Sequence, residues 1–230
     1  MIPAQFDYVR ARSLRDVMNA LAGGDAKVIA GGHSLLPLMR FRLAQPAKLV
    51  DISDLAELKV IEEKGRGARI GAAATYRDVL DSVLLTERYP LIIEAVLGIG
   101  DTQVRNRGTV GGGLAHADPA SDLPAVMLAL DATFNLRSKA GRRSVPAKDF
   151  FQGAFTTAMR EDEILSDIVL PAPVRKAGTP YVSFEQKASG YAIAAAAAIV
   201  TKSRKTITGV TLALTGVSDK AFLANASPAI

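Results

Sequence analysis

Apolar residues first recur at helical spacing between Ser13 and Ala22. The stripe consists of Leu14, Val17, Met18 and Leu21. This spacing predicts an amphipathic helix. Ser13 is a residue type that caps helix N-termini, and Gly23-Gly24 follows the last apolar position. Both ends of the helix are therefore predicted as well.

Short apolar runs bounded by turn residues follow this helix, and runs of this kind are typical of strands. The predicted strands cover residues 27–30, 49–52, 59–63, 69–74, 133–137 and 164–170, with a hairpin turn at 64–67. Further helices are predicted to begin at Ser34, Thr75 and Ser121, and another covers residues 91–96.

The C-terminal part of the chain has a mixed pattern. Residues 192–198 are rich in alanine, which favours a helix, whereas the isoleucine and valine around them favour a sheet. Residues 202–205 make a good turn between two sheet-like runs, so we predict two strands. Prolines and glycine between Pro171 and Pro180 mark a boundary, and a further lobe is predicted to begin near Tyr181.

Residues 101–120 read DTQVRNRGTVGGGLAHADPA and show little periodicity. They are predicted to form a long glycine-rich loop, and loops of this length in compact domains are usually functional or disordered. The loop leads into a helix whose start, Ser121 to Pro124, repeats the Ser-x-x-Pro pattern of Ser34 to Pro37. Each of the two glycine-rich segments is thus followed by a predicted helix.

Composition removes several classes of function. The 230 residues are 49% hydrophobic and 22% charged, and they contain no cysteine and two histidines. Disulfides, thiolate metal sites and cysteine nucleophiles are thereby excluded, and no motif offers a carboxylate-based metal site. The net charge of +5 is scattered, which disfavours a nucleic-acid groove. No run approaches the roughly 20 apolar residues of a membrane span, and no signal peptide is visible, so we expect a cytoplasmic protein without membrane insertion.

The glycine-rich segments are candidates for binding a diphosphate. Such a group needs several backbone N–H donors with no side chain in the way, and consecutive glycines allow that approach. Residues 31–34 (GGHS) follow a predicted strand, and residues 109–113 (TVGGG) offer a second nest. A tight turn chosen for packing alone is the alternative for each segment. Neither Rossmann nor Walker spacing is present.

Several side chains near these segments have two interpretations. Ser34 can contact a phosphate or cap a helix. Asp122 can accept from a cofactor hydroxyl or simply favour the start of its helix. His33 and His116 are interpreted as loop histidines rather than general bases. Arg105 and Arg107 either bind an anionic group or hold the loop in place. All these residues lie in or beside the two segments: Ser34, His33, Arg105, Arg107, His116 and Asp122.

Three segments resemble the medium, FAD-binding subunits of molybdenum hydroxylases, nearest the aerobic carbon monoxide dehydrogenase group and more distantly the FAD domain of xanthine dehydrogenase. They are residues 30–43 (AGGHSLLPLMRFRL), 100–125 (GDTQVRNRGTVGGGLAHADPASDLPA) and 184–194 (FEQKASGYAIA). The resemblance implies an α+β fold of the vanillyl-alcohol-oxidase or PCMH type. Residues 1–175 would form the FAD-binding domain, with lobes at about 1–54 and 55–175, and residues 179–230 a C-terminal lobe.

The resemblance also implies a set of cofactor contacts. Tyr191 would approach the isoalloxazine ring, Asp122 would hold a cofactor hydroxyl, and Lys187 is carried over across an ambiguous register. The full set that the resemblance implies is Val28, Ile29, Ala30, Gly31, Gly32, His33, Ser34, Leu35, Ile99, Thr109, Val110, Gly111, Gly112, Gly113, Asp122, Leu165, Lys187 and Tyr191. No residue is predicted to be catalytic and none to bind a metal.

Two positions depart from the family pattern. Gly113 stands where relatives usually have Asn or Ser, so one side-chain hydrogen bond is unavailable. The chain ends at Ile230, whereas relatives continue, so the C-terminal lobe is expected to be incomplete or the chain a fragment.

By resemblance, the chain is an oxidoreductase subunit that binds FAD and passes electrons on. A large partner would carry molybdopterin and a small partner [2Fe–2S] clusters, assembled as a dimer of heterotrimers. Two alternatives remain open: a self-sufficient flavin oxidase or dehydrogenase of the same fold, and a non-enzymatic nucleotide-binding module.

Overall fold

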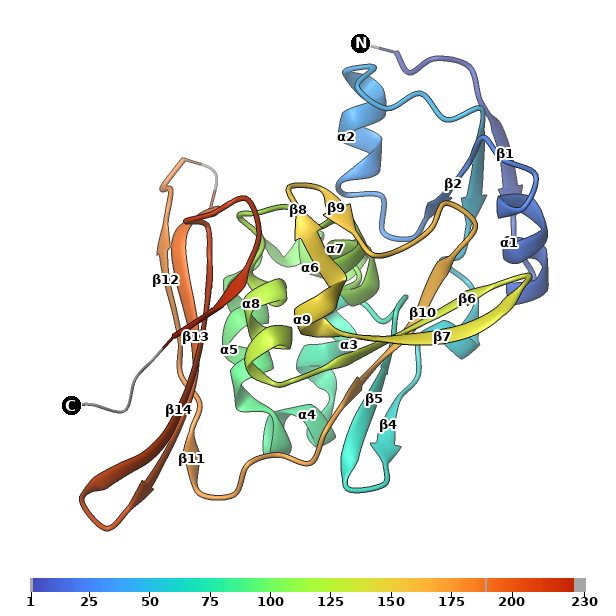
Figure 1. The fold of residues 1–230 in the computed structure, drawn as a ribbon. Helices are drawn as coiled ribbons and strands as arrows, with labels where there is room; N and C mark the ends of the chain where they lie inside the picture. Colours follow the sequence, from blue (N-terminus) through green and yellow to red (C-terminus); the bar gives the residue numbers. More distant parts are fainter. Residues whose placement is uncertain (1, 189, 226–230) are drawn as a thin grey trace.

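The computed structural model describes residues 2–188 and 190–225, and within them the strands form three main sheets and one small one (Figure 1). The chain builds these sheets one after another, except that a single late strand returns to the centre of the second. The predicted α+β class is confirmed, since helices and strands are both abundant and the sheets are largely antiparallel.

The first sheet is small and parallel, in the order β1-β3-β2. Its strands are β1 (Asp7–Arg10), β2 (Ala26–Ile29) and β3 (Lys48–Asp51), and its helices are α1 (Leu14–Leu21) and α2 (Leu35–Arg40). The predicted cap of α1 is present, because Ser13 accepts from the Asp16 amide. Val17, Leu21 and Val50 are buried together in a core of their own.

The second sheet has the order β4-β5-β10-β6-β7 and is antiparallel. Its strands are β4 (Ile61–Lys64), β5 (Gly67–Gly71), β6 (Thr133–Ser138), β7 (Gly141–Pro146) and β10 (Ile164–Leu170). A short 3-10 helix, η1 (Ala56–Leu58), joins the two lobes. The small sheet of β8 (Phe151–Gly153) and β9 (Thr156–Thr157) lies beside it. The predicted hairpin is confirmed, with Gly65 at φ +60° in its turn.

Helices cover one face of this sheet (Figure 1). They are α3 (Tyr76–Asp81), α4 (Val83–Arg88), α5 (Pro90–Gly98), α8 (Asp122–Ala129) and α9 (Ala147–Phe150). Every residue of α8 from Leu123 to Ala129 is buried, so this helix is apolar on all sides. Thr75 begins α3 with a capping box, in which Asp78 returns the hydrogen bond.

The prediction of one long loop over residues 101–120 is wrong. The segment contains two helices, α6 (Thr102–Arg107) and α7 (Val110–His116). Each has a side-chain cap: Asp101 accepts from Val104 N at 2.8 Å, and Thr109 accepts from Gly112 N at 3.1 Å. Three successive glycines are poor helix formers, so propensity does not predict α7. Tertiary contacts stabilise it instead: the helix packs against β10, β9 and α8, and its first amides donate to Ala74 and Ala72.

The third sheet contains β11 (Ala177–Gly178), β12 (Tyr181–Glu185), β13 (Ala192–Ser203), β14 (Thr206–Thr215) and β15 (Phe222–Ala224). The alanine-rich segment is therefore a strand, as predicted. Its small side chains let α8 approach closely: Ala195 and Ala197 are buried on the face toward that helix. Besides the two helices within residues 101–120, several elements are not among those predicted from the sequence, because they are short or their apolar patterns are weak: β1, η1, α4, β7, α9, β8, β9, β11, β12 and β15.

Candidate functional site

The first glycine segment connects β2 to α2 and presents a row of free backbone donors. Within the described part of the chain, no protein oxygen accepts the N–H groups of Gly31, Gly32, His33 or Ser34. Gly32 has φ +78°, a conformation that glycine adopts without strain. The Ser34 hydroxyl makes no cap hydrogen bond to α2, so it is free as well. Four adjacent unpaired amides can together donate to one anion.

The two glycine-rich segments meet in space. A Cβ atom on Gly31 would lie 2.0 Å from the Arg107 carbonyl oxygen and 3.0 Å from the Gly108 Cα. Only glycine allows such an approach, because real Cβ contacts are longer. Gly108 directly precedes Thr109, the cap of α7. The loop between β2 and α2 therefore packs on the start of the second segment, on the side of the first lobe that faces α7 in Figure 1.

The second segment is not the row of free donors that the sequence predicts. Four of its five amides already have protein partners: among them, Val110 N donates to Ala74 O at 2.9 Å and Gly111 N to Ala72 O at 2.8 Å. The amides of Gly112 and Gly113 donate to the side chain and carbonyl of Thr109. Its part in cofactor binding stays a prediction, and it would depend on close approach rather than on these amides.

Packing explains two of the three glycines of this segment. A Cβ on Gly111 would lie 2.4 Å from the Ala72 Cβ, and one on Gly113 would lie 2.5 Å from the Tyr76 hydroxyl. Gly112 is exposed, and a Cβ there would meet only the Thr109 hydroxyl. Close packing on Ala72 thus accounts for Gly111, and whether Gly111 also contacts a cofactor stays a prediction.

Asp122 lies at the start of α8, and its carboxylate accepts a hydrogen bond from a tyrosine. The Tyr181 hydroxyl donates to Asp122 Oδ1 at 2.5 Å. Burial raises the pKa of Asp122, while this hydrogen bond lowers it. Burial, followed by the charge of Asp122, raises the pKa of Tyr181 above its ordinary value. One carboxylate oxygen is left over for a ligand, so the predicted cofactor contact is compatible with this pair.

The hairpin that joins β12 to β13 carries the two C-terminal candidates. Lys187 is exposed near its tip, and Tyr191 follows it with 56% of its surface exposed. The hairpin closes through Gln186 N donating to Tyr191 O at 2.8 Å. Burial raises the pKa of Tyr191, and the charges of Asp118 and Asp122 raise it further. An exposed aromatic face beside the α8 start can stack on a flat ring.

The remaining predicted contacts lie at different depths. Val28 and Ala30 pack against the core of the first lobe, and Ile29 pairs with Asp51 in the parallel ladder. Leu35 is half-buried at the first turn of α2. Ile99 packs on the main core, and the Leu165 side chain is buried within it. Whether any of these contacts a cofactor stays a prediction.

The structure distinguishes the roles left open for the basic residues. Arg105 ties down the chain, because its Nη1 donates to the carbonyls of Ile99 at 3.0 Å and Gly100 at 2.7 Å. His33 is exposed. His116 packs on Phe155 with ring centroids 5.1 Å apart. Burial lowers the pKa of His116, the charge of Asp118 opposes this, and the charge of Lys27 adds to it.

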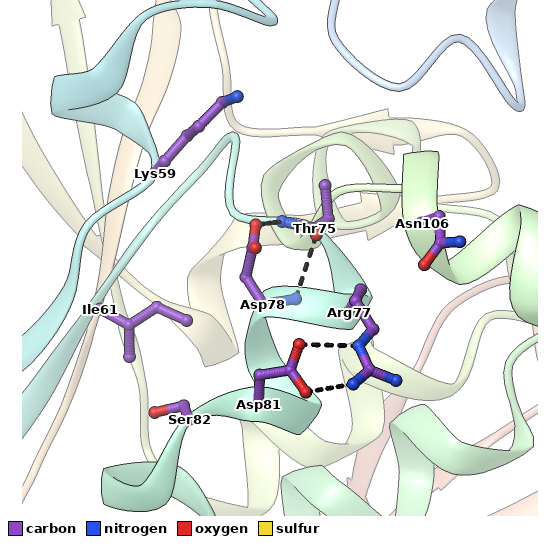
Figure 2. A pocket seen from close by; sticks show the side chains of 8 residues that line it. All are labelled: Lys59, Ile61, Thr75, Arg77, Asp78, Asp81, Ser82 and Asn106. Atoms are coloured by element: carbon purple, nitrogen blue, oxygen red, sulfur yellow. Dashed lines mark hydrogen bonds and ion pairs between the residues drawn. The ribbon is translucent and has the colours of Figure 1, made fainter.

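A polar cavity of about 540 Å³ lies beside α3 and is lined by residues of α3, β4 and α6 and of the adjoining turns (Figure 2). Most of its charged groups are already paired, since Arg77 binds Asp81 at 2.5 and 2.7 Å and Thr75 and Asp78 form the capping box. Thr75, which lines this cavity, forms an isolated antiparallel β-bridge with Thr109, so the cavity adjoins the second segment. It does not contain the free amides.

Two tyrosines close to the site were missed from the sequence. Tyr76 lies beside Gly113, and Tyr181 binds Asp122. A lone tyrosine after a cap or a proline carries no recognisable pattern, so no sequence feature could have identified them. In residues 2–188 and 190–225, no group of three histidine, aspartate or glutamate side chains could hold a metal ion. Over the same residues, no helix is long and apolar enough to cross a membrane.

Comparison with known proteins is consistent with this geometry. Residues 4–173 match the family described as the FAD binding domain in molybdopterin dehydrogenase. The chain is 41% identical over 224 residues to the carbon monoxide dehydrogenase medium chain of Hydrogenophaga pseudoflava, covering 96% of this chain and 78% of that one. It is 40% identical over 225 residues to the glyceraldehyde dehydrogenase medium chain of Sulfolobus acidocaldarius, covering 97% and 80%.

The fold is likewise shared with a solved structure. Carbon monoxide dehydrogenase from H. pseudoflava, in a form lacking the Mo-pyranopterin moiety, superposes with a TM-score of 0.95 at 41% identity. The match covers 98% of this chain and 79% of that chain. The arrangement of the three main sheets is therefore that of the solved relative.

Proposed function

The chain belongs to the FAD-binding medium subunits of molybdenum hydroxylases, and from this premise we propose that it acts as the electron-transfer subunit of such a complex. We further propose two partners, a large subunit that holds molybdopterin and a small subunit that holds [2Fe–2S] clusters. The 230 residues contain no cysteine, so cluster thiolates would come from the small partner. The proposed assembly is a dimer of heterotrimers, with an FAD-binding domain at residues 1–175 and a further lobe at 179–230.

The free amides of Gly31 to Ser34 are the observation that carries this proposal. The residues fit a dinucleotide diphosphate, because an unpaired N–H row, a free serine hydroxyl and a closely packed backbone leave room for phosphate oxygens. Val28 to Leu35 would hold the diphosphate, and Thr109 to Gly113 would approach it from the opposite wall. Tyr191 would lie against the flavin ring and Asp122 would accept from a cofactor hydroxyl.

When bound, FAD supplies the redox chemistry, taking electrons from the clusters of the small partner and passing them to an external acceptor. The chain's own contribution is to bind and orient the cofactor. No general acid or base is assigned: His33 is exposed in solvent, and His116 is packed on Phe155 with a lowered pKa. Substrate oxidation is accordingly assigned to the molybdenum partner.

The first test is reconstitution of the purified chain with FAD. We expect flavin absorbance to co-elute with the protein and flavin fluorescence to change on binding. Retention of ADP or NAD in preference to FAD would refute the cofactor assignment. The second test adds small aldehydes and alcohols to the reconstituted chain. Flavin bleaching without any partner would contradict the electron-transfer role and establish a self-sufficient oxidase.

The assembly is tested by co-expression with a cysteine-rich small chain and a large molybdopterin-binding chain of a molybdenum hydroxylase. We expect the three to co-purify in equal amounts, with a mass twice that of one heterotrimer. When substrate is added, the flavin of this complex should be reduced, whereas the flavin of the isolated chain should stay oxidised. A flavin that stays oxidised in the intact complex would overturn the proposal.

A further inference from the structure

Tyr76 lies along the second glycine segment, against Gly113 within it and Gly108 just before it. Its amide donates to Gly108 O at 2.9 Å. A Cβ on Gly108 would lie 2.7 Å from the Tyr76 ring carbon Cε2, and a Cβ on Gly113 would lie 2.5 Å from its hydroxyl. Both positions are therefore kept free of side chains by this one tyrosine. The side chain spans the segment from before α7 to within its first turn.

The hydroxyl of Tyr76 has no protein partner, although 93% of the residue is buried, since its exposure is 7%. No hydrogen bond from it occurs in the described part of the chain. Among those residues only Ser183 Oγ is both enclosed and unpartnered, so solvent must reach the Tyr76 hydroxyl. A buried polar group normally finds a partner. A buried aromatic side chain whose hydroxyl reaches solvent and has no protein partner is suited to donate to a ligand.

The neighbourhood is that of the proposed cofactor site. Burial raises the pKa of Tyr76, and the charge of Asp122 and the Tyr191 hydroxyl raise it further. Both neighbours are predicted cofactor contacts. The raised pKa keeps the hydroxyl protonated at neutral pH, so that it can donate a hydrogen bond.

We propose that the Tyr76 hydroxyl donates a hydrogen bond to the bound dinucleotide, in the space that the absent side chain of Gly113 leaves beside it. Tyr76 is thus a cofactor-binding residue of this chain. The inference rests on the proposed function, because it concerns the same site. It also explains residue 113: the hydroxyl of residue 76 and a side chain at residue 113 compete for one place.

The competition makes a definite geometric prediction. In the chain as it is, a side chain at residue 113 must displace the hydroxyl by about 0.9 Å, from 2.5 Å to an ordinary contact of 3.4 Å. In the Tyr76→Phe variant the nearest ring atom, Cζ, is 3.8 Å away, and a side chain fits. A hydroxyl can then be supplied from the other side by Gly113→Ser.

The experiment compares four proteins with the unchanged chain by FAD fluorescence titration and thermal unfolding. Tyr76→Phe should raise the Kd for FAD about tenfold, the loss of one hydrogen bond, with an unchanged Tm in the absence of FAD. Gly113→Ser alone should also weaken binding, because it displaces the hydroxyl. The double variant Tyr76→Phe/Gly113→Ser should bind more tightly than Tyr76→Phe. Tyr89→Phe is the matched control. The Tyr89 hydroxyl lies outside the proposed site and donates to Pro171 O at 2.7 Å. Its removal should lower the Tm and leave the Kd for FAD unchanged.

Each outcome decides a different claim. If the unchanged chain binds FAD and Tyr76→Phe binds it equally tightly, the inference is wrong while the proposed function stands. A double variant no tighter than Tyr76→Phe, or a Tyr76→Phe protein whose weaker binding is matched by a lower Tm, would also overturn it. If the unchanged chain binds no FAD at all, the proposed function has failed and the inference with it.

Discussion

Gly31→Ala is the substitution that tests most directly whether the meeting of the two glycine segments builds the site. The added Cβ would lie 2.0 Å from Arg107 O, 2.7 Å from Arg107 C and 3.0 Å from Gly108 Cα. All three atoms belong to backbone, so no flexible side chain can move aside. An ordinary contact of about 3.4 Å requires the segments to separate by about 1.4 Å, which is 3.4 minus 2.0.

A separation of this size moves the free amides of Gly31 to Ser34 away from the opposite wall. Hydrogen bonds weaken steeply once donor and acceptor part by this distance, and several amides are displaced together. Loss of two charge-assisted hydrogen bonds at about 1.5 kcal/mol each corresponds to roughly a 100-fold increase in Kd. Local packing should cost the unliganded protein about 1–3 kcal/mol of unfolding free energy.

The assay is FAD titration by flavin fluorescence, with urea unfolding measured alongside it. Gly178→Ala is the matched control, because a Cβ there meets nothing within 4 Å and its φ is ordinary. We expect the control to bind FAD as the unchanged chain does. A Gly31→Ala protein that is folded and binds FAD with the unchanged Kd would refute the convergence of the two segments as the basis of the site.

Three further outcomes follow from the described residues. Ser34→Ala should weaken FAD binding about tenfold without changing the Tm, because the hydroxyl makes no cap bond; an equal Kd would assign Ser34 to no ligand. Arg105→Met should lower the Tm by removing bonds to three carbonyls, whereas a Tm unchanged on substitution would show that the loop holds without it. Arg143→Met leaves Glu163 buried with only the Arg160 amide as a donor and should cost about 3 kcal/mol at pH 7 in urea unfolding. The hydrogen bonds from Arg143 lower the pKa of Glu163, so this contribution is present above its usual value of 4.5 and is lost as the pH falls; a deficit that does not shrink in acid would contradict it.

Local structure was predictable wherever a short stretch of sequence contains all the residues that determine its conformation. The α1 stripe and its Ser13 cap, the hairpin at Gly65 and the choice of strand for the alanine-rich segment are confirmed. Each depends on spacing, capping or turn residues within a few positions. The glycine motifs were likewise visible, and they led to the right family.

The helices in residues 101–120 were not predictable, because their stability comes from elsewhere in the chain. Helix α7 contains three glycines, which propensity counts against it. It forms because Ala72 and Ala74 accept its first amides and Tyr76 covers its glycines. A pattern confined to the segment contains none of these partners.

The sequence by itself determined where the chain can turn, which segments lack side chains, and which family those segments belong to. Only the tertiary structure decided which glycines keep amides free for a ligand and which pack against another part of the backbone. Gly31 to Ser34 keep free amides, whereas Ala72 takes up the space beside Gly111 and accepts its amide. It also decided that Tyr181 binds Asp122 and that Tyr76 stands beside Gly113. The physical reason is that a free donor is defined by the absence of a partner, and partners in this fold come from residues distant along the chain.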